Sequence, residues 1–239
     1  MRVAICAFAP SREITPKDSH LGARTLGEAK RRSTELQQTL SSLRTPVPRV
    51  SAALRKLALA ASNKIGRDCY VHAELGRALL QEMQIHAHTV VGYASWRIGP
   101  GSGDVIAHAP QAECPSTAHA SGLMYHAWLE CSGVIIDFTT YQLAIKAREL
   151  DAMDGGATHV AWCPDFLVLP KREAHRFSEV RQSYSVGLAY YEARPELHAE
   201  LGPAFSIDPA DLRAARLILL NPTLNVLGPN HFECLGATP

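Results

Sequence analysis

The segment YHAWLECSGVIIDFT, residues 125–139, decides the predicted fold of this chain. Two apolar runs flank Ser132-Gly133, and a pair ending in glycine between such runs fits a two-residue β-hairpin loop. With this loop, Cys131 lies opposite Val134 and the two strands run antiparallel. The segment therefore predicts a hairpin with a defined register.

This register gathers polar side chains on one face of the hairpin. Asp137 comes to lie opposite Trp128, and Thr139 comes to lie opposite His126. Side chains alternate along a strand, so these four residues share a face with Glu130. His126 and Asp137 are diagonal neighbours about 7–8 Å apart, a gap that an imidazole and a carboxylate can bridge. The pair is either a base with its orienting carboxylate or two polar groups that satisfy each other at a sheet edge.

A cysteine at a predicted helix start supplies a candidate nucleophile. CYVHAELGRALLQEMQ, residues 69–84, predicts a largely buried helix that begins at Cys69, with Asp68 as its N-cap. Unpaired N–H groups and the helix dipole favour an anion at this end of a helix. A neighbouring imidazolium favours the thiolate further. We therefore group Cys69 with His126 and Asp137 as a candidate catalytic triad.

The combined pattern resembles the transglutaminase-like superfamily of papain-fold thiol enzymes. In that pattern a cysteine opens a helix, a strand ending in Gly-Tyr follows, and then come a His-Ala-Trp-x-Glu strand and an aspartate on the next strand. The matching positions here are Cys69, Gly92-Tyr93, 126–130 and Asp137. The resemblance covers about residues 63–140, whereas the first 60 and last 100 residues resemble no family in this way.

The resemblance implies a chemistry for the three residues. Cys69 would attack a carboxamide or ester carbonyl to form an acyl-thioester, His126 would take the thiol proton and pass it to the leaving group, and Asp137 would orient the imidazole. The backbone N–H of Cys69 would be one oxyanion donor. Asn63, six residues before the cysteine, is a candidate for the second donor, because papain-like proteases have a glutamine at that spacing. A helix-capping role is the alternative for Asn63.

Four further side chains are candidates for lining the cleft. They are Trp128, Glu130, Thr139 and His72. His72 follows Cys69 by three residues and so lies on a similar helix face; it is a rival base or a packing or surface residue. Glu130 is either in the cleft or a solvated strand carboxylate, and Trp128 either shields the His–Asp pair from water or belongs to the core.

The remaining segments predict an α+β fold in which a central helix packs on an antiparallel sheet. Expected helices and strands, some of them short, are as follows: a strand at 1–10, helices at 24–44 and 50–62 separated by a stop at TPVPR, strands at 86–98 and 104–109, a strand within 159–172, and helices within 172–193 and 208–219. Residues 99–122 read mostly as a loop, a flap over the cleft. We expect a single domain, 1–239, with a catalytic core at about 63–170, a helical part at 20–62 and a C-terminal part at 171–239.

The composition limits which binding partners and which cellular compartment we expect for the chain. A formal net charge of +1 gives no sign of the basic surface that binds nucleic acid or an anionic membrane. No apolar run approaches the roughly 20 residues that span a bilayer. The six cysteines form no C-x-x-C pair, which fits the cytoplasm. His86 and His88 have a spacing that some metal sites use, but no carboxylate or cysteine cluster accompanies them, so neither a metal nor a cofactor is expected.

Three functions remain open from the sequence. The first is a hydrolase, a peptidase or amidase acting on a peptide, protein or small amide, since thiol enzymes of this kind in small chains need only water as acceptor. The second is an acyltransferase or transglutaminase with an amine acceptor; the R-G-G-x-C run associated with arylamine N-acetyltransferases is absent from IGRDC, residues 65–69. The third is a catalytically inactive papain-like module that binds a peptide or protein.

Overall fold

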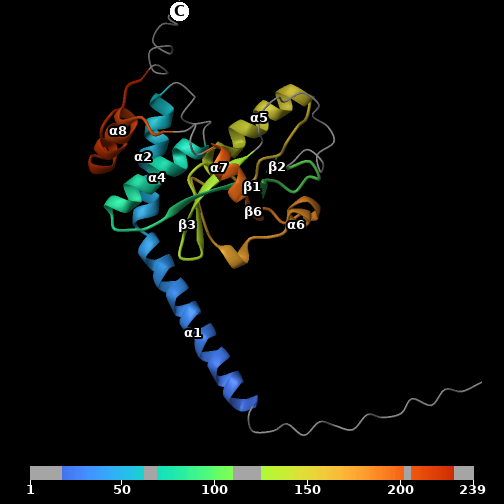
Figure 1. Cartoon of the computed structure of the whole chain (residues 1–239). Helices are drawn as coiled ribbons and strands as arrows, with labels where there is room; N and C mark the ends of the chain where they lie inside the picture. The colour runs from blue at the N-terminus through green and yellow to red at the C-terminus, as the bar shows by residue number, and fades with distance from the viewer. Residues whose placement is uncertain (1–17, 62–68, 110–124, 202–205, 229–239) are drawn as a thin grey trace, which may run out of the picture.

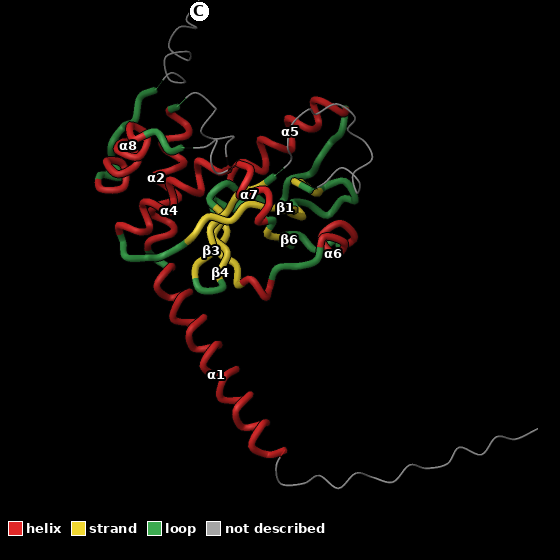
Figure 2. Tube along the Cα trace, viewed as in Figure 1, coloured by secondary structure: helices red, strands yellow, loops and turns green. Residues whose placement is uncertain are grey.

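The structure, a computed structural model, describes residues 18–61, 69–109, 125–201 and 206–228. The predicted strand at 1–10, the Asp68 cap, the oxyanion candidate Asn63 and most of the predicted 99–122 loop lie outside these ranges. The fold is α+β, with an antiparallel sheet between helices (Figure 1). Figure 2 shows three helices on one side of the strands, α2 (Pro46–Ala60), α4 (Cys69–Glu82) and α8 (Pro209–Leu220), and two on the other, α5 (Leu143–Asp154) and α6 (Phe177–Gln182).

The described strands form one six-stranded sheet in which every pairing is antiparallel. The strands are β1 His88–Arg97, β2 Val105–His108, β3 His126–Cys131, β4 Val134–Asp137, β5 Leu167–Pro170 and β6 Ala189–Ala193. The order is β2-β1-β3-β4-β5, and β6 pairs with β1 as well. Because Ala94 pairs with both His108 and Tyr191, β2 and β6 lie on opposite edges of β1. The long strand β1 is therefore the organising strand of the sheet.

The hairpin adopts the predicted register. Cys131 pairs with Val134, and the next two pairs continue the same alignment up to Leu129 and Ile136. Ser132 and Gly133 have φ angles of 46° and 78°, the two positive values that a type I′ turn requires and that glycine adopts without strain. The ladder ends at the pair of Leu129 and Ile136, so the predicted pairings of Asp137 with Trp128 and of Thr139 with His126 are not part of it.

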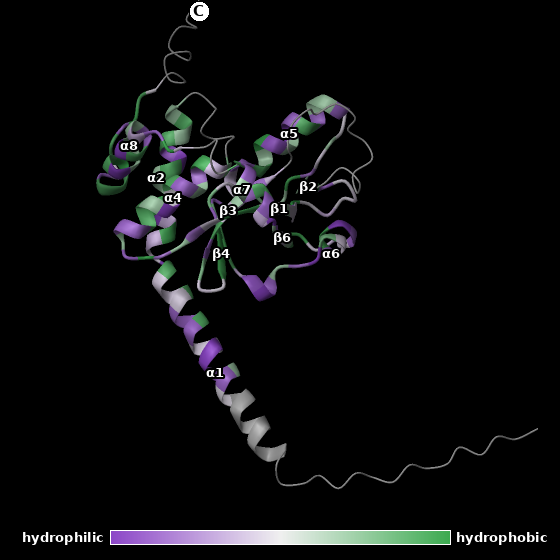
Figure 3. Ribbon diagram, viewed as in Figure 1, coloured by the Kyte–Doolittle hydropathy of each residue, from purple (hydrophilic) through white to green (hydrophobic). Residues whose placement is uncertain are grey.

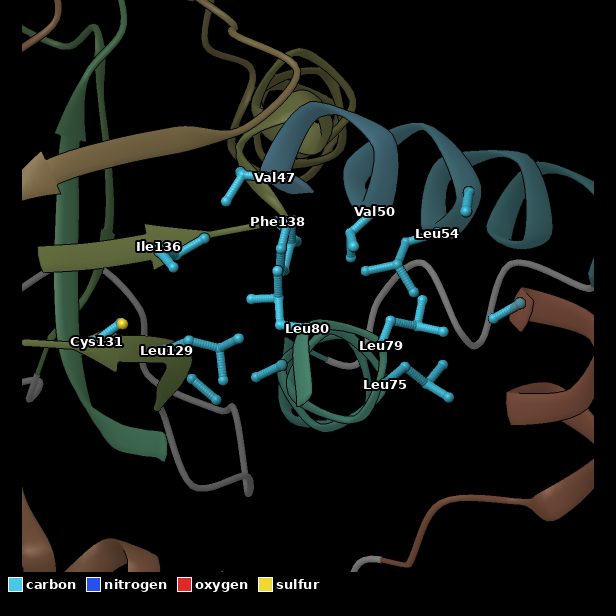
Figure 4. Packing of buried hydrophobic residues seen from close by; sticks show 14 of the residues in the cluster. Val47, Val50, Leu54, Leu75, Leu79, Leu80, Leu129, Cys131, Ile136 and Phe138 are labelled. Carbon is cyan, nitrogen blue, oxygen red and sulfur yellow. The ribbon is translucent and has the colours of Figure 1, made fainter. Parts of the chain in front are cut away.

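The helix α4, Cys69–Glu82, packs between α2, Pro46–Ala60, and the strands β3 and β1. Figure 4 shows it nearly end-on, with Leu75, Leu79 and Leu80 pointing into the core. These three side chains are fully buried, and burial of each contributes about 1.5–3 kcal/mol. Apolar packing of this kind fixes the position of the helix start and so of Cys69.

A glycine lets the helix approach the end of β4. A Cβ on Gly76 would lie 2.4 Å from a ring carbon of Phe138, which is the residue after Asp137. The aromatic ring of Phe138 occupies the space that any larger side chain would need. This contact ties the helix that carries Cys69 to the strand that carries Asp137.

The TPVPR segment ends the first helix, as predicted, but it also begins the second helix, which was expected to start at 50. The helix α1, Asp18–Leu43, ends before it, and α2 starts at Pro46. Proline is favoured in the first helical turn because the N–H that it lacks has no partner there. The two helices are therefore separated only by residues 44 and 45.

The second half of the chain departs most from the prediction. The helix expected near 172–193 is present only as the short α6, Phe177–Gln182, after a 3₁₀ turn (η3) at Lys171–Glu173, and it is wrong for Ala189–Ala193, which form the strand β6. Two helices were not predicted, α5 Leu143–Asp154 and α7 Pro195–Leu201, whereas α8, Pro209–Leu220, agrees with the expected helix. The sheet thus extends beyond residue 170, because pairing with β1 determines the conformation of 189–193.

The helix α1 points away from the rest of the fold (Figure 1). Its described side chains are mostly polar and exposed over 27–35, as the colouring in Figure 3 also shows, and Leu36 and Leu43 are buried near its end. Among the helices that the structure describes, none is both long and apolar enough to cross a membrane.

Candidate active site

Three element ends bring the predicted triad together. Cys69 is the first residue of α4, His126 is the first residue of β3, and Asp137 is the last residue of β4. The packing of α4 on β3 sets the first two against each other, and the hairpin register sets the last two. The geometry therefore depends on the core and not on a loop.

The predicted His–Asp contact is present and buried. Nε2 of His126 donates to Oδ2 of Asp137 at 2.9 Å. His126 is 3% exposed and Asp137 is 0% exposed. A buried carboxylate needs partners for its oxygens, since an unpaired one would carry a large desolvation penalty.

Asp137 receives three more hydrogen bonds. The backbone N–H of Thr139 donates to Oδ1 at 2.8 Å, and its hydroxyl donates to the same oxygen at 2.7 Å. The hydroxyl of Tyr191 donates to Oδ2 at 2.8 Å. In turn, Nε1 of Trp96 donates to the Tyr191 hydroxyl at 2.9 Å. The carboxylate is thus held by residues from β1, β3, β6 and the turn after β4.

The electrostatics of the pair favour its charged form. Burial raises the pKa of Asp137, but the charge of His126 and the hydrogen bonds from His126 and Thr139 outweigh it, and the net pKa lies below the usual value. Burial lowers the pKa of His126, but the Asp137 charge and hydrogen bond, with a hydrogen bond and charge from Cys69, raise it to about 10. The imidazole therefore carries a proton at neutral pH.

Cys69 completes the arrangement. Its thiol lies close enough to His126 to contribute to the raised pKa of that imidazole. Nε2 of the imidazole is engaged by Asp137, which leaves Nδ1 as the ring nitrogen available to the sulfur. The thiol is free and half-buried. The imidazole thus has a hydrogen-bonded carboxylate and a thiol as neighbours.

Aromatic rings enclose His126. The ring of Trp96 meets it edge-on at a centroid distance of 4.8 Å, and Trp128 lies nearly parallel to it at 6.3 Å. Trp128 is 1% exposed. These rings exclude water from the His–Asp bond. Trp128 therefore shields the pair rather than lining an open cleft.

A second histidine lies beside the first. The ring centroids of His108 and His126 are 5.5 Å apart, and His108 also meets Trp96 edge-on at 5.8 Å. Burial, the charge of His126 and the charge of Lys146 lower the pKa of His108 to about 3, with a partial offset from Asp137. The two imidazoles thus carry different charge at neutral pH.

The other predicted cleft residues have different environments. Glu130 accepts a hydrogen bond from Trp128 at 3.3 Å and forms an ion pair with Lys171 at 2.9 Å. It lies four residues along β3 from His126, about 13 Å at about 3.3 Å per residue. Thr139 turns back to hold Asp137. Both side chains are therefore engaged in structural contacts.

His72 is a buried residue and not a surface one. It is 0% exposed, and its Nε2 lies 3.1 Å from the hydroxyl of Tyr141. The neighbouring Gln142 amide donates to the same hydroxyl at 2.9 Å. This contact favours the packing role that the sequence left open for His72.

Sequence reasoning missed three residues of the site. Trp96 lies in a predicted strand, and its role as a donor gave no sequence signal. Tyr191 lies in a segment predicted to be helical, although the aromatic residues of AYYEA at 189–193 are typical of a strand. His108 lies in the predicted strand at 104–109 and was not singled out. Trp96 lies on β1 itself, whereas Tyr191 and His108 reach the site because β6 and β2 pair with β1.

The described part of the chain has no group of three or more histidine, cysteine or acidic side chains placed to hold a metal ion. His86 and His88 are both exposed.

Comparisons with known proteins do not identify the chain. No protein-family model matches it, and no curated protein matches it. A solved crystal structure described only as that of a genomics target superimposes with a TM-score of 0.46 and 19% identity, over 74% of this chain and 78% of the other. A similarity at this level supports no conclusion about fold family or function. The site is thus characterised by its own geometry, a buried His–Asp hydrogen bond with a cysteine beside the histidine.

Proposed function

We propose that the chain is a thiol-dependent enzyme of the transglutaminase-like, papain-like type. It attacks a carboxamide bond of a peptide, protein or small amide and passes through an acyl-thioester on Cys69. The observation that carries this proposal is the buried imidazole of His126, hydrogen-bonded to Asp137 and close enough to the Cys69 thiol for the thiol to raise its pKa. A histidine that served only packing would not need a thiol partner at a helix start.

The acylation step follows from the charge of the pair. In the proposed reaction the Cys69 sulfur attacks as the thiolate, beside a His126 imidazolium that keeps its proton up to a pKa of about 10. The sulfur attacks the carbonyl carbon, and the carbonyl oxygen becomes an oxyanion. As the C–N bond breaks, the imidazolium gives its proton to the leaving nitrogen. The products are a thioester on Cys69, a neutral His126 and a free amine.

The start of α4 provides oxyanion stabilisation. Cys69 is the first residue of the helix, where backbone N–H groups have no helical acceptor and the helix dipole is positive. The N–H of Cys69 is the donor closest in sequence to the developing charge. Asn63 stays a candidate for the second donor and lies outside the described residues.

Water then resolves the thioester in the favoured reaction, hydrolysis. Neutral His126 takes a proton from water, the oxygen attacks the thioester carbon, and the C–S bond breaks. The carboxylic acid leaves, and the thiolate–imidazolium pair is restored. Asp137 keeps the imidazole in one orientation throughout, because its own oxygens are fixed by Thr139 and Tyr191.

A trapping experiment tests this proposal. The protein is mixed with p-nitrophenyl acetate, and the intact mass and the modified peptide are measured over time. We expect a burst of nitrophenol equal to one acetyl group per chain, located on Cys69. The Cys69→Ser variant loses the burst, whereas Cys163→Ser keeps it. Cys163 is a matched control, since it is also free and half-buried.

Two other outcomes would each favour one of the alternative functions. Capture of the acyl group by added glycine ethyl ester faster than by water indicates an acyltransferase. Absence of any acyl group on Cys69, or equal modification of Cys69 and Cys163, rejects enzymatic thiol chemistry and leaves a peptide-binding module.

A further inference from the structure

His108 and His126 are neighbours in the sheet. His126 pairs with Gly92 and His108 pairs with Ala94, two residues further along β1. Positions two apart on a strand share a face and are about 6.6 Å apart. The ring centroids of the two imidazoles are 5.5 Å apart.

The other polar groups around His126 already have partners. Asp137 accepts four hydrogen bonds. The Tyr191 hydroxyl donates to Asp137 and accepts from Trp96. Nε1 of Trp128 donates to Glu130.

The ring of His108 differs from these groups. Within the described ranges it makes no hydrogen bond, and it is half-buried at the end of β2. A half-buried imidazole with no hydrogen-bond partner among the described residues is free to bond to a ligand that enters beside it.

The charge state of His108 suits a small polar ligand. Burial, His126 and the Lys146 side chain on α5 keep its pKa near 3, and the Asp137 charge offsets this only in part. The ring is therefore neutral across the working pH range and presents one N–H donor and one nitrogen acceptor. A neutral imidazole can hold a water molecule without competing with His126 for its proton.

We propose that His108 binds the water molecule that resolves the acyl-enzyme and holds it beside His126. This inference rests on the thiol-enzyme function proposed above. One hydrogen of the water is accepted by a ring nitrogen of His108, and the other is taken by Nδ1 of neutral His126 as the oxygen attacks the thioester carbon. The C–O bond forms, the C–S bond breaks, and Cys69 leaves as the thiolate. An amine acceptor would use the same site through its N–H.

Ring shape and hydrogen bonding can be separated by substitution. His108→Phe keeps an aromatic ring beside His126 and removes both nitrogens. His108→Gln and His108→Asn place an amide near Nε2 and Nδ1 respectively and remove the ring. A packing role predicts that Phe is tolerated and the amides are not, whereas water binding predicts the reverse for at least one amide.

The experiment measures acylation and deacylation separately in stopped flow with p-nitrophenyl acetate. For His108→Phe we expect a burst rate within about threefold of wild type and a turnover after the burst that falls about tenfold, the loss expected from one hydrogen bond. The acetyl-enzyme then accumulates in intact-mass spectra. His108→Gln or His108→Asn restores deacylation to within about threefold.

The outcomes distinguish failure of this inference from failure of the enzyme itself. A wild-type burst with unchanged deacylation in His108→Phe overturns the role of His108 and leaves the thiol enzyme standing. Equal losses of burst and turnover in the Phe and both amide variants, with far-UV circular dichroism unchanged, also overturn it. No burst in the wild type rejects the proposed function. If His108→Phe does not fold, the deacylation rates of His108→Gln and His108→Asn are compared with the wild-type rate. A rate within about threefold of wild type in one of them supports the inference, and slowed deacylation in both contradicts it.

Discussion

The charge of His126 is the property of the site that can be perturbed most cleanly. The Asp137→Asn substitution keeps the size of the side chain and removes its charge. In the wild type the pKa of His126 is about 10, against an ordinary 6.5, and this difference corresponds to about 5 kcal/mol of interaction as an upper bound. With the carboxylate gone, burial dominates, so the pKa of His126 falls below 6.5 and the imidazole is neutral at pH 7.

The assay is an NMR titration of the imidazole Cε1–H signals from pH 5 to pH 10. We expect wild-type His126 to stay protonated to about pH 9 and the variant to titrate below pH 6.5. Asp104→Asn is the control, because Asp104 is also a buried carboxylate with backbone hydrogen bonds but is not among the groups that shift the pKa of His126. A wild-type midpoint near 6.5, or the same midpoint in Asp137→Asn, refutes the reasoning.

The same shift has a consequence for stability. A histidine whose pKa is raised in the folded state stabilises it fully below pH 6.5, and this contribution is lost as the pH rises from 6.5 towards 10. Asp137 has a lowered pKa, so its contribution is present above its ordinary 3.8 and is lost as the pH falls further. Urea denaturation should therefore show a larger loss of stability between pH 6.5 and pH 10 in the wild type than in Asp137→Asn. Equal losses in the two proteins contradict this.

Three further substitutions test the support of the site. Tyr191→Phe removes one hydrogen bond from Asp137 and should slow the acylation burst by up to about tenfold; an unchanged burst rate argues against a positioning role. Gly76→Ala pushes a methyl group against Phe138 and should lower the free energy of unfolding by about 1–3 kcal/mol in urea, a result that a stabilised variant would contradict. Leu79→Ala opens a cavity between α4 and α2 and should lower it by about 2–5 kcal/mol; a loss below 1 kcal/mol refutes tight packing there.

The hairpin and its His–Asp contact could be predicted because they depend on local chain geometry. A two-residue turn fixes the register, and the register fixes which side chains share a face. Cys69 was identified for a similar reason, since a helix start is visible in the sequence. These predictions use either residues that are close in sequence or the start of a single helix. Neither requires knowledge of which distant segments of the chain pair with each other.

The rest of the site depends on contacts between distant parts of the chain. Tyr191 reaches Asp137 from 54 residues away, and Trp96 donates to Tyr191 across 95 residues. Pairing with β1 makes 189–193 a strand, against the helix that the local sequence suggested. His108 meets His126 because both β2 and β3 pair along the same strand. Neither hydrophobic periodicity nor turn chemistry reports such pairings.

The central claim, that Cys69 is activated by His126, is tested most directly by alkylation. The protein is treated with iodoacetamide from pH 5 to pH 9, and the labelling rate of each cysteine is followed by mass spectrometry. We predict that Cys69 reacts faster than Cys163 and Cys131 below pH 7, and that His126→Ala removes this advantage. Slow labelling of Cys69 that rises with pH as for an ordinary thiol, and that is the same in His126→Ala, would contradict the claim.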